Sequence, residues 1–307
     1  MVETVEIFTS AWGRFAVSTV ADAKMAAVFG RGRHPQEEMI ELLSAFITKE
    51  SIVVDVGAHI GTIAVPLAAQ ARKVIAYEPD IGSFNLLREN ARLNGASLDL
   101  RNKGLGSASA RATIMCVRPG NAGSNTLMTG DGPITIAALD AEVSQAHLIK
   151  LDVEGMEYEV LQGATLLIRG SRPTVCFEVN LSQLRAHGTS VQKLESFFRS
   201  NNYRLYIPLH TKRGRCLGRV PALSLVTFWI MPGAYLLKRA SSTFDVIAIP
   251  TERVFPLPWA PGWKTVSKLI YATMTDKVRR AKIILRRLCL LVPDDALAKE
   301  KARKVSC

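Results

Sequence analysis

Two short apolar runs, each tipped with a carboxylate, constrain the fold of this chain more than any other feature. Residues 52–56 are a β-branched run that contains Asp55 and continues into a glycine-bearing loop. A second apolar run, residues 73–78, ends in Glu78. A buried strand, a glycine-bearing turn, a helix and a second strand ending in an acid make the adenosine-binding half of a Rossmann-like sheet.

The loop between these runs indicates which adenosine-bearing ligand it binds. A dinucleotide loop usually shows three glycines as G-x-G-x-x-G, because a pyrophosphate must approach bare backbone. Here Gly57 and Gly61 stand in a G-x-x-x-G spacing, and Asp55 precedes them. A carboxylate at the strand tip would repel a pyrophosphate and attract a cationic group. These residues therefore predict S-adenosylmethionine, which carries an ammonium and a sulfonium beside its adenosine.

The net charge of +12 is concentrated near the end of the chain. Residues 264–307 hold twelve Lys or Arg against four Asp or Glu, a local charge of +8 that leaves +4 for the other residues. We therefore expect no specific nucleic-acid binding by the core. Apolar residues fall on one helical face of 278–292 and basic residues on the other. Such a helix would lie on an anionic membrane surface through 264–292, dock on the domain with a solvated basic face, or form a nucleic-acid or partner site.

A cytoplasmic location is expected from the remaining segments. The first residues lack the basic start and apolar core of a signal peptide. The most apolar region, 222–237, is about 16 residues long and is interrupted by Pro232 and Gly233, short of the ~20 that a membrane-spanning helix needs. The five cysteines form no C-x-x-C pair, which favours reduced thiols over disulfides or a zinc site.

The periodicity of apolar residues divides the chain into three parts. Residues 1–50 are expected to be an N-terminal segment with one amphipathic helix. Residues 51–250 alternate strands with helices, which predicts βαβ crossovers and a parallel sheet, with an insertion at about 210–243. Residues 251–307 form a basic C-terminal extension. The expected strands are 52–56, 73–78, 98–102, 111–117, 133–139, 147–152, 173–180, 203–209, 223–231 and 244–249, and the expected helices are 35–46, 62–71, 84–94, 154–168 and 191–199.

Acids at four expected strand ends mark the edge of the sheet where ligands bind. Besides Asp55 and Glu78 these are Asp152 and Glu178, which we expect to be catalytic. Asp152 is the first choice for the base that takes a hydroxyl proton. Together with Glu178 it could instead ligate a divalent metal, although a metal is not favoured. Lys150 is expected deeper in the strand, paired with an acid.

The remaining candidates contact the cofactor or the substrate. For His59, a cofactor-side contact or loop packing is favoured over catalysis. The loop 118–131 is either a surface loop or a substrate lid. The expected cofactor contacts are Asp55, Gly57, Ala58, His59, Gly61 and Glu78, and the expected substrate contacts are Glu154, Asn180 and Asn125.

Four motifs together are similar to a known family. They are Asp-Val-Gly-Ala-His-Ile-Gly at 55–61, Tyr-Glu-Pro-Asp at 77–80, Ile-Lys-Leu-Asp-Val-Glu-Gly-Met-Glu at 149–157 and Phe-Glu-Val-Asn at 177–180. Over about residues 15–250 the chain resembles the FkbM family of S-adenosylmethionine-dependent methyltransferases. The resemblance implies an α/β, Rossmann-like class I methyltransferase fold: a seven-stranded, mostly parallel sheet with helices on both faces.

The same resemblance implies O-methylation of hydroxyls on sugars or polyketide-type natural products. We therefore expect an S-adenosylmethionine-dependent O-methyltransferase that acts on a sugar or glycan hydroxyl. The alternatives are a polyketide-type hydroxyl or a nitrogen acceptor, a catalytically silent module that keeps the cofactor pocket, and an oxidoreductase. No motif in residues 1–50, 118–131 or 210–243 identifies the acceptor.

Overall fold

The computed structural model describes residues 4–211, 214–220, 223, 243–254 and 259–260. The chain falls into two compact units, Met1–Tyr206 with Thr243–Pro256, and Ile207–Ser242 with Leu257–Cys307. In the second unit β13 (Gly214–Arg219) pairs in parallel with β15 (Trp259–Ala260). The first unit contains the cavity considered below. The predicted division into three parts stays a prediction.

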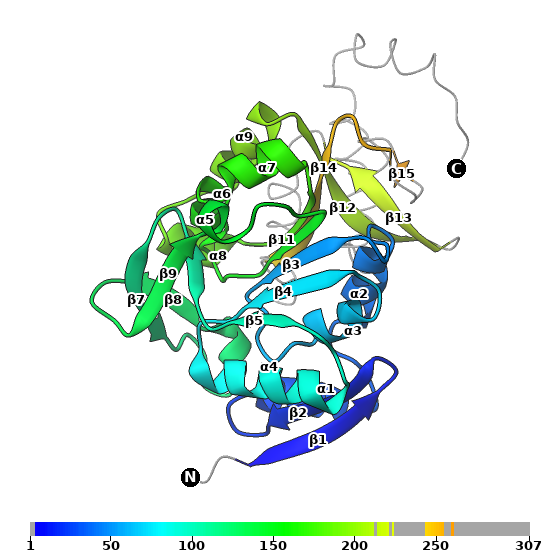
Figure 1. Cartoon of the computed structure of the whole chain (residues 1–307), viewed down its shortest axis with the longest axis vertical. Coiled ribbons are helices and arrows are strands. Elements are labelled where there is room, and N and C mark those ends of the chain that lie inside the picture. The colour runs from blue at the N-terminus through cyan, green and yellow to red at the C-terminus, as the bar shows by residue number, and fades with distance from the viewer. Residues whose placement is uncertain (1–3, 212–213, 221–222, 224–242, 255–258, 261–307) are drawn as a thin grey trace, which may run out of the picture. The chain divides into compact units, whose positions relative to one another are not determined.

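Seven strands of the described chain lie in the first unit, six of them wholly and β12 as far as Tyr206. They are β3 (Ile52–Val56), β4 (Lys73–Tyr77), β5 (Asp99–Arg101), β10 (Leu148–Leu151), β11 (Thr174–Asn180), β12 (Tyr203–Thr211) and β14 (Thr243–Pro250). Their order in space is β12-β14-β11-β10-β3-β4-β5 (Figure 1). The strands from β11 to β5 run parallel, and β14 is antiparallel to both of its neighbours. The predicted mostly parallel sheet is confirmed, but over the described residues it has nine strands rather than seven, because β13 and β15 also belong to it.

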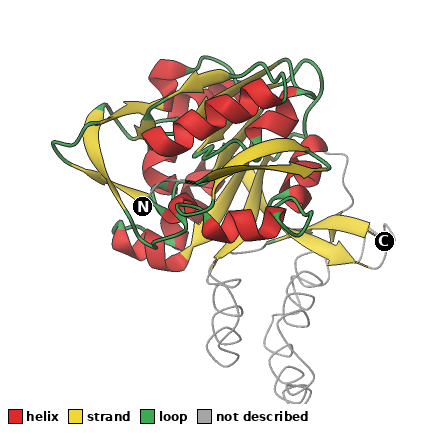
Figure 2. Ribbon diagram, turned by 90° about the horizontal axis from the view of Figure 1, so that it is seen from below, coloured by secondary structure: helices red, strands yellow, loops and turns green. Residues whose placement is uncertain are grey.

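Helices cover both faces of this sheet (Figure 2). From β3 the chain moves to β4 and β5, whereas from β10 it moves the opposite way to β11. Right-handed crossovers in opposite directions place their helices on opposite faces. The first set is α3 (Ala64–Ala68) and α4 (Ile81–Leu93), and the second is α6 (Glu157–Gln162), α7 (Thr165–Ser171), α8 (Leu181–Ala186) and α9 (Val191–Ser200).

The helix expected over 154–168 is in fact the two helices α6 and α7. The break falls at Gly163, which caps the end of α6. A Cβ at this position would lie 2.0 Å from the carbonyl oxygen of Gly106. The chain therefore passes so close to a neighbouring strand that only glycine fits, and the apolar spacing continues through the break without revealing it.

Two expected strands, 111–117 and 133–139, belong to a separate four-stranded sheet. Its order is β6-β9-β7-β8. In β7 buried residues alternate with exposed ones, whereas β10 is buried along its whole length. Alternation of this kind is typical of a sheet with one solvated face, and a central parallel strand is buried on both. The strands are β6 (Gly104–Gly106), β7 (Ala110–Met115), β8 (Thr126–Thr129) and β9 (Ile134–Ala138), and β9 leads into the short α5 (Leu139–Glu142).

The N-terminal segment folds against the domain. The expected helix 35–46 is present as α2 (Glu37–Ser44). The antiparallel hairpin of β1 (Val5–Ser10) and β2 (Gly13–Ser18) and the helix α1 (Ala23–Phe29) were not predicted. Fully buried Phe15 and Val17 of β2 share a core cluster with Phe29 of α1 and with Ile60, which follows β3. This packing brings residues near position 22 to the loop after β3.

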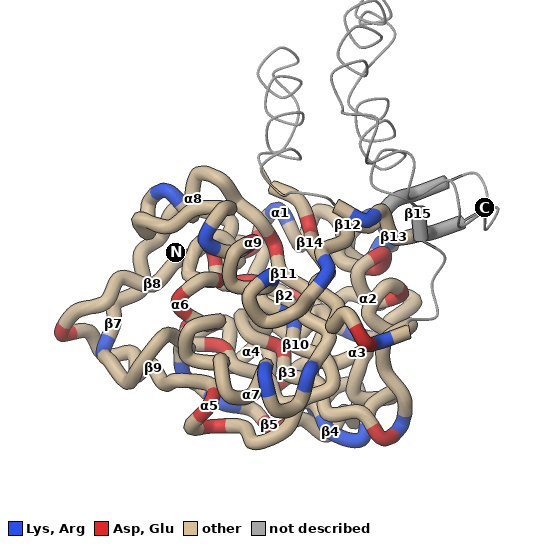
Figure 3. Tube along the Cα trace, turned by 90° about the horizontal axis from the view of Figure 1, so that it is seen from above, with Lys and Arg blue, Asp and Glu red and all other residues tan. Residues whose placement is uncertain are grey.

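Several expectations concern residues beyond the described ranges. The expected strand 223–231, apart from Leu223, and the helix 278–292 lie outside the described residues, as does most of the insertion at 210–243. Along the described trace, basic and acidic residues are interspersed (Figure 3). Among the described helices, none has the length and apolar character needed to cross a bilayer.

Candidate functional site

A cavity of about 230 Å³ opens at the carboxyl ends of the central strands. Its walls come from the loop after β3, the tip of β4, the residues after β10, Glu178 of β11 and the loop 121–127. β3 and β10 are adjacent in the sheet, and the chain leaves them in opposite directions. Such a switch point is where open α/β sheets bind their ligands.

Gly57 lets two strand ends approach each other beneath the cavity. Its φ is +78°, and a Cβ here would lie 1.9 Å from the carbonyl oxygen of Asp152. The backbone N–H groups of Gly57 and Ala58 donate to the carbonyl of Tyr77 at 3.0 and 2.9 Å. Both residues line the cavity. Gly61, with φ +86°, is not a lining residue, and a Cβ there would lie 2.6 Å from Leu87 of α4.

Glu78 presents an oriented carboxylate to the cavity. It is buried, and its two oxygens accept the backbone N–H groups of His59 and Asp80, each at 2.8 Å. Burial raises the pKa of Glu78 to about 7, although the facing His59 and the two N–H donors oppose the rise. Each carboxylate oxygen can accept a second hydrogen bond. Glu78 is thus placed to receive the hydroxyls of a ribose.

Lys150 joins two of the predicted acids in different ways. Its Nζ lies 3.1 Å from Oδ2 of Asp152 and 3.6 Å from Oδ1 of Asp55. Lys150 and Asp152 line the cavity, whereas Asp55 is fully buried and is not a lining residue. Burial raises the pKa of Asp55, with Lys150 opposing. Lys150 therefore occupies the paired position that the sequence suggested, and a direct contact of Asp55 with a cofactor stays a prediction.

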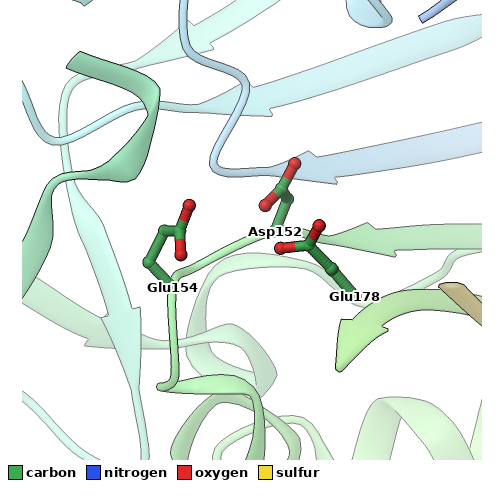
Figure 4. A group of neighbouring side chains, drawn as sticks. All are labelled: Asp152, Glu154 and Glu178. Carbon is green, nitrogen blue, oxygen red and sulfur yellow. The ribbon is translucent and has the colours of Figure 1, made fainter. Parts of the chain in front are cut away.

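Three carboxylates converge on one side of the cavity (Figure 4). Asp152, Glu154 and Glu178 each offer an oxygen within 4.8 Å of the others. Burial, followed by the charges of Asp152 and Glu154, raises the pKa of Glu178 to about 9. Burial and then Asp152 raise the pKa of Glu154 to about 7. Close carboxyls cannot all ionise in a partly buried site without a cation, so the group could hold a divalent metal or the cationic end of a ligand.

Two further polar residues, Asp245 and Asn180, are neighbours of this acidic group. Asp245 of β14 stands opposite Glu178 in the antiparallel ladder, and burial raises its pKa to about 6. The sequence offered a signal for Asp245, an acid in an otherwise apolar strand, but it was not among the candidates. Asn180 donates to Glu154 at 3.3 Å and caps α8 through Gln183, and it does not line the cavity.

The loop 121–127 forms one wall of the cavity. Asn125 lines it, and its Oδ1 is buried without a hydrogen-bond partner in the described part of the chain. A buried carbonyl of this kind is costly unless a donor reaches it, so it is suited to a ligand hydroxyl or amine. Thr126 donates to the carbonyl of Glu154 at 3.0 Å and lies 2.8 Å from Nε2 of His187. Thr126 therefore anchors this loop to the backbone at Glu154.

His59 forms an ion pair with Asp22, a residue that was not among the predicted site residues. Its Nε2 lies 2.9 Å from Oδ2 of Asp22, and the side chains are 13% and 2% exposed. Burial alone would lower the pKa of His59, but Asp22, Glu78 and Asp152 together raise it above its ordinary value. No sequence signal links position 22 to the loop after β3, because only the packing of the N-terminal segment brings them together.

A family model and a relative of known activity both match part of this chain. Residues 55–205 match the methyltransferase FkbM domain. The hexuronic acid methyltransferase AglP of Haloferax volcanii is 33% identical over 138 residues, which cover 42% of this chain and 56% of that protein. The match thus spans little more than half of the relative's length.

Solved structures show lower similarity. A methyltransferase FkbM from Methylobacillus flagellatus KT is 23% identical, covering 43% of this chain and 33% of that one, with a TM-score of 0.31. TYW2 of M. jannaschii, solved in complex with AdoMet, is 15% identical, covering 81% of this chain and 85% of that one, with a TM-score of 0.43.

Proposed function

Because residues 55–205 form a methyltransferase domain of the FkbM family, we propose that the chain transfers a methyl group from S-adenosylmethionine to a hydroxyl of a sugar or glycan. The observation that carries this proposal is the cavity in which Gly57, Glu78 and Asp152 meet from three adjacent strand ends. The hexuronic acid methyltransferase of Haloferax volcanii supports a sugar acceptor, and an acidic sugar in particular.

The cavity residues suit the cofactor in three respects. At Gly57, a side chain would strike the carbonyl of Asp152, so only glycine keeps the backbone exposed there. Glu78 would accept the ribose hydroxyls. Asp152, Glu154 and Glu178 offer negative charge to a cationic group. When bound, S-adenosylmethionine supplies a methyl group that its sulfonium activates.

The protein's own contribution is positioning, charge and removal of a proton. Correct alignment of the acceptor oxygen is the largest contribution expected. The orphaned Oδ1 of Asn125 would orient an acceptor hydroxyl. Asp152 lines the cavity, and the Nζ of Lys150 lies 3.1 Å from its Oδ2. Glu178 and Glu154 share this acidic surface, where a bound cation would lower their raised pKa values.

Ligand binding and methyl transfer test the proposal in two steps. Calorimetry with S-adenosylhomocysteine should show binding, and calorimetry with NADH should show none. Methyl transfer from labelled S-adenosylmethionine is then measured on uronic-acid oligosaccharides, neutral oligosaccharides, a polyketide-type alcohol and an amine. Transfer to the oligosaccharides supports the proposal. Tight NADH binding would favour an oxidoreductase, and binding of S-adenosylhomocysteine without any transfer would favour a silent module.

We also propose a cytoplasmic enzyme that contacts the inner membrane surface through residues 264–292. The support is the sequence pattern alone, since basic and apolar residues segregate over 278–292. Deletion of 264–307 should reduce sedimentation with anionic liposomes and leave the affinity for S-adenosylhomocysteine unchanged. Equal sedimentation of the truncated and full-length proteins would exclude the membrane contact.

A further inference from the structure

We propose that His59 and Asp22 form a dyad in which His59 takes the proton of the acceptor hydroxyl and Asp22 positions it. The inference rests on the proposed function, because it assigns the proton acceptor of the same cavity. It differs from the sequence-based expectation, which gave this role to Asp152 and treated His59 as a cofactor contact or a packing residue.

The two ring nitrogens of His59 have different surroundings, since only Nε2 forms an ion pair. Nε2 lies 2.9 Å from Oδ2 of Asp22. A proton on Nε2, facing the carboxylate, leaves the lone pair of the neutral ring on Nδ1. Among the described residues, Nδ1 has no hydrogen-bond partner. Because His59 lines the cavity, Nδ1 is the atom that can accept a proton from a bound molecule.

Backbone hydrogen bonds hold both His59 and Asp22 in place. His59 has φ +51°, and its N–H donates to Oε2 of Glu78 at 2.8 Å. Asp22 precedes α1, where its N–H donates to Ser18 at 3.0 Å and its carbonyl accepts from Ala26 at 2.9 Å. The ring also lies beside Gly123 of the cavity wall, where a Cβ would be 3.6 Å from Cε1. A base held in this way loses little freedom when the acceptor arrives.

The charges around His59 favour its protonated form. The groups facing it are Asp22 of the N-terminal segment, Glu78 at the tip of β4 and Asp152 after β10, and Lys24 lines the same cavity. The three acids favour the imidazolium and outweigh the effect of burial on the pKa of His59. General bases are most effective when their pKa is close to the working pH. Asp152, by contrast, is already ion-paired with Lys150 at 3.1 Å.

The proposed step conserves charge and atoms. The acceptor oxygen gains a bond to the methyl carbon, the electron pair of the broken carbon–sulfur bond stays with sulfur, and the hydroxyl proton moves to Nδ1 of His59. The positive charge that sulfur loses therefore reappears on an imidazolium that Asp22 stabilises. Release of this proton to solvent restores the neutral ring for the next turnover.

The first test measures the protonation of His59 without turnover. An NMR pH titration of the ligand-free protein gives its pKa, with the signal identified by its absence in His59→Asn. Asparagine is chosen because it tolerates the left-handed backbone at this position. The wild-type pKa is expected above the ordinary value of about 6.5, and Asp22→Asn should lower it by about one pH unit. A wild-type pKa at or below the ordinary value, or no change in Asp22→Asn, would overturn the proposal.

The second test follows kcat against pH for the wild type and three variants. His59→Asn should lower kcat by about 100-fold or more and abolish the fall in rate at acidic pH. Asp22→Asn should move that fall to lower pH, because its His59 loses protons more readily. Asp152→Asn should keep the fall where it is in the wild type. Calorimetry with S-adenosylhomocysteine, expected within about threefold of the wild type for His59→Asn, confirms that this variant is folded.

The outcomes separate the dyad from the proposed function. Wild-type kcat in His59→Asn, or an acidic fall that disappears only in Asp152→Asn, would refute the dyad and leave the methyltransferase proposal intact. A wild type that binds S-adenosylhomocysteine but methylates no acceptor would count against the function. The titration would then still decide whether Asp22 controls the protonation of His59, and an unchanged pKa would refute the dyad in that case as well.

Discussion

Gly57 is the residue at which backbone conformation and close packing can be tested separately. Gly57→Ala must adopt a φ of +78° and push against the carbonyl of Asp152. Gly32→Ala, with φ +70° and no neighbour within 4 Å of its Cβ, carries the backbone strain alone. We expect Gly32→Ala to lower the free energy of unfolding by about 1 kcal/mol and Gly57→Ala by about 3 kcal/mol or more. Urea unfolding of the two variants measures both, and equal losses would show that the approach of β3 to β10 is not as close as described.

Asp152 is the residue at which the proposed dependence of methyl transfer on negative charge can be tested. Asp152→Asn keeps the shape of the side chain but removes the charge that Lys150 and the acidic group share. We expect methyl transfer to fall at least about 100-fold with affinity for S-adenosylhomocysteine retained, since that ligand lacks the sulfonium charge. Turnover and calorimetry measure the two effects. Unchanged turnover would remove Asp152 from the reacting centre.

The helix α4 ties the N-terminal hairpin to the loop after β3 through Asn90. The side chain is fully buried; its Oδ1 accepts from Ala16 at 2.6 Å, and its Nδ2 donates to the carbonyls of Ala16 and Ile60 at 3.1 and 2.8 Å. Asn90→Leu leaves three buried backbone groups unpaired. We expect a loss of about 2–4 kcal/mol in the free energy of unfolding and faster hydrogen exchange in β2.

Asn94, one turn further along α4, is the matched control for Asn90. It also bonds the hairpin, accepting from the N–H of Arg14 and donating to its carbonyl, but these two bonds are exposed to solvent and the residue is only half-buried. Water can replace those bonds, so Asn94→Ala should cost less than about 1.5 kcal/mol. If the two variants lose the same stability, burial of the Asn90 bonds is not what secures the hairpin.

The elements of the main sheet could be predicted because burial on both faces produces continuous apolar runs. The runs at 52–56, 73–78 and 147–152 became β3, β4 and β10, and their parallel order places the acids at one edge. The depth of each acid could not be predicted in the same way. Asp55 stands one residue before the end of β3, level with Lys150, whereas Asp152 lies just beyond β10. A difference of two residues in this register separates Asp152, which reaches the cavity, from Asp55, which does not.

Contacts between distant elements account for most of what the sequence did not reveal. The pair of Asp22 and His59 depends on where the hairpin packs, and nothing local to either residue encodes it. Asp245 reaches the acidic group only because β14 lies antiparallel to β11 with Glu178 opposite. Positions of this kind are fixed by tertiary pairing, whereas strand ends and glycine turns are fixed by local pattern.

At the scale of the whole molecule, buried acids around the cavity couple folding to pH. Burial raises the pKa values of Glu78 and Glu154 to about 7, of Glu157 to about 8 and of Glu178 to about 9. The folded chain therefore holds protons that the unfolded chain, with ordinary carboxyl pKa values, has already released. Where the folded state binds more protons than the unfolded state, stability falls as pH rises. The raised pKa of His59 acts in the same direction, since its contribution is lost as pH rises through the folded value.

Between about pH 7 and pH 9 this effect should be unopposed, because groups with lowered pKa values act at lower pH. His34, with a pKa of about 4, and the paired Asp99, with a pKa of about 2, change the stability only below that window. We expect the free energy of unfolding of the ligand-free protein to fall by about 4–5 kcal/mol from pH 7 to pH 9. Glu178→Gln removes the acid with the highest pKa of the group, so its loss over the same range should be about half as large. Urea unfolding at several pH values measures both proteins, and parallel curves would mean that Glu178 is already ionised at pH 7.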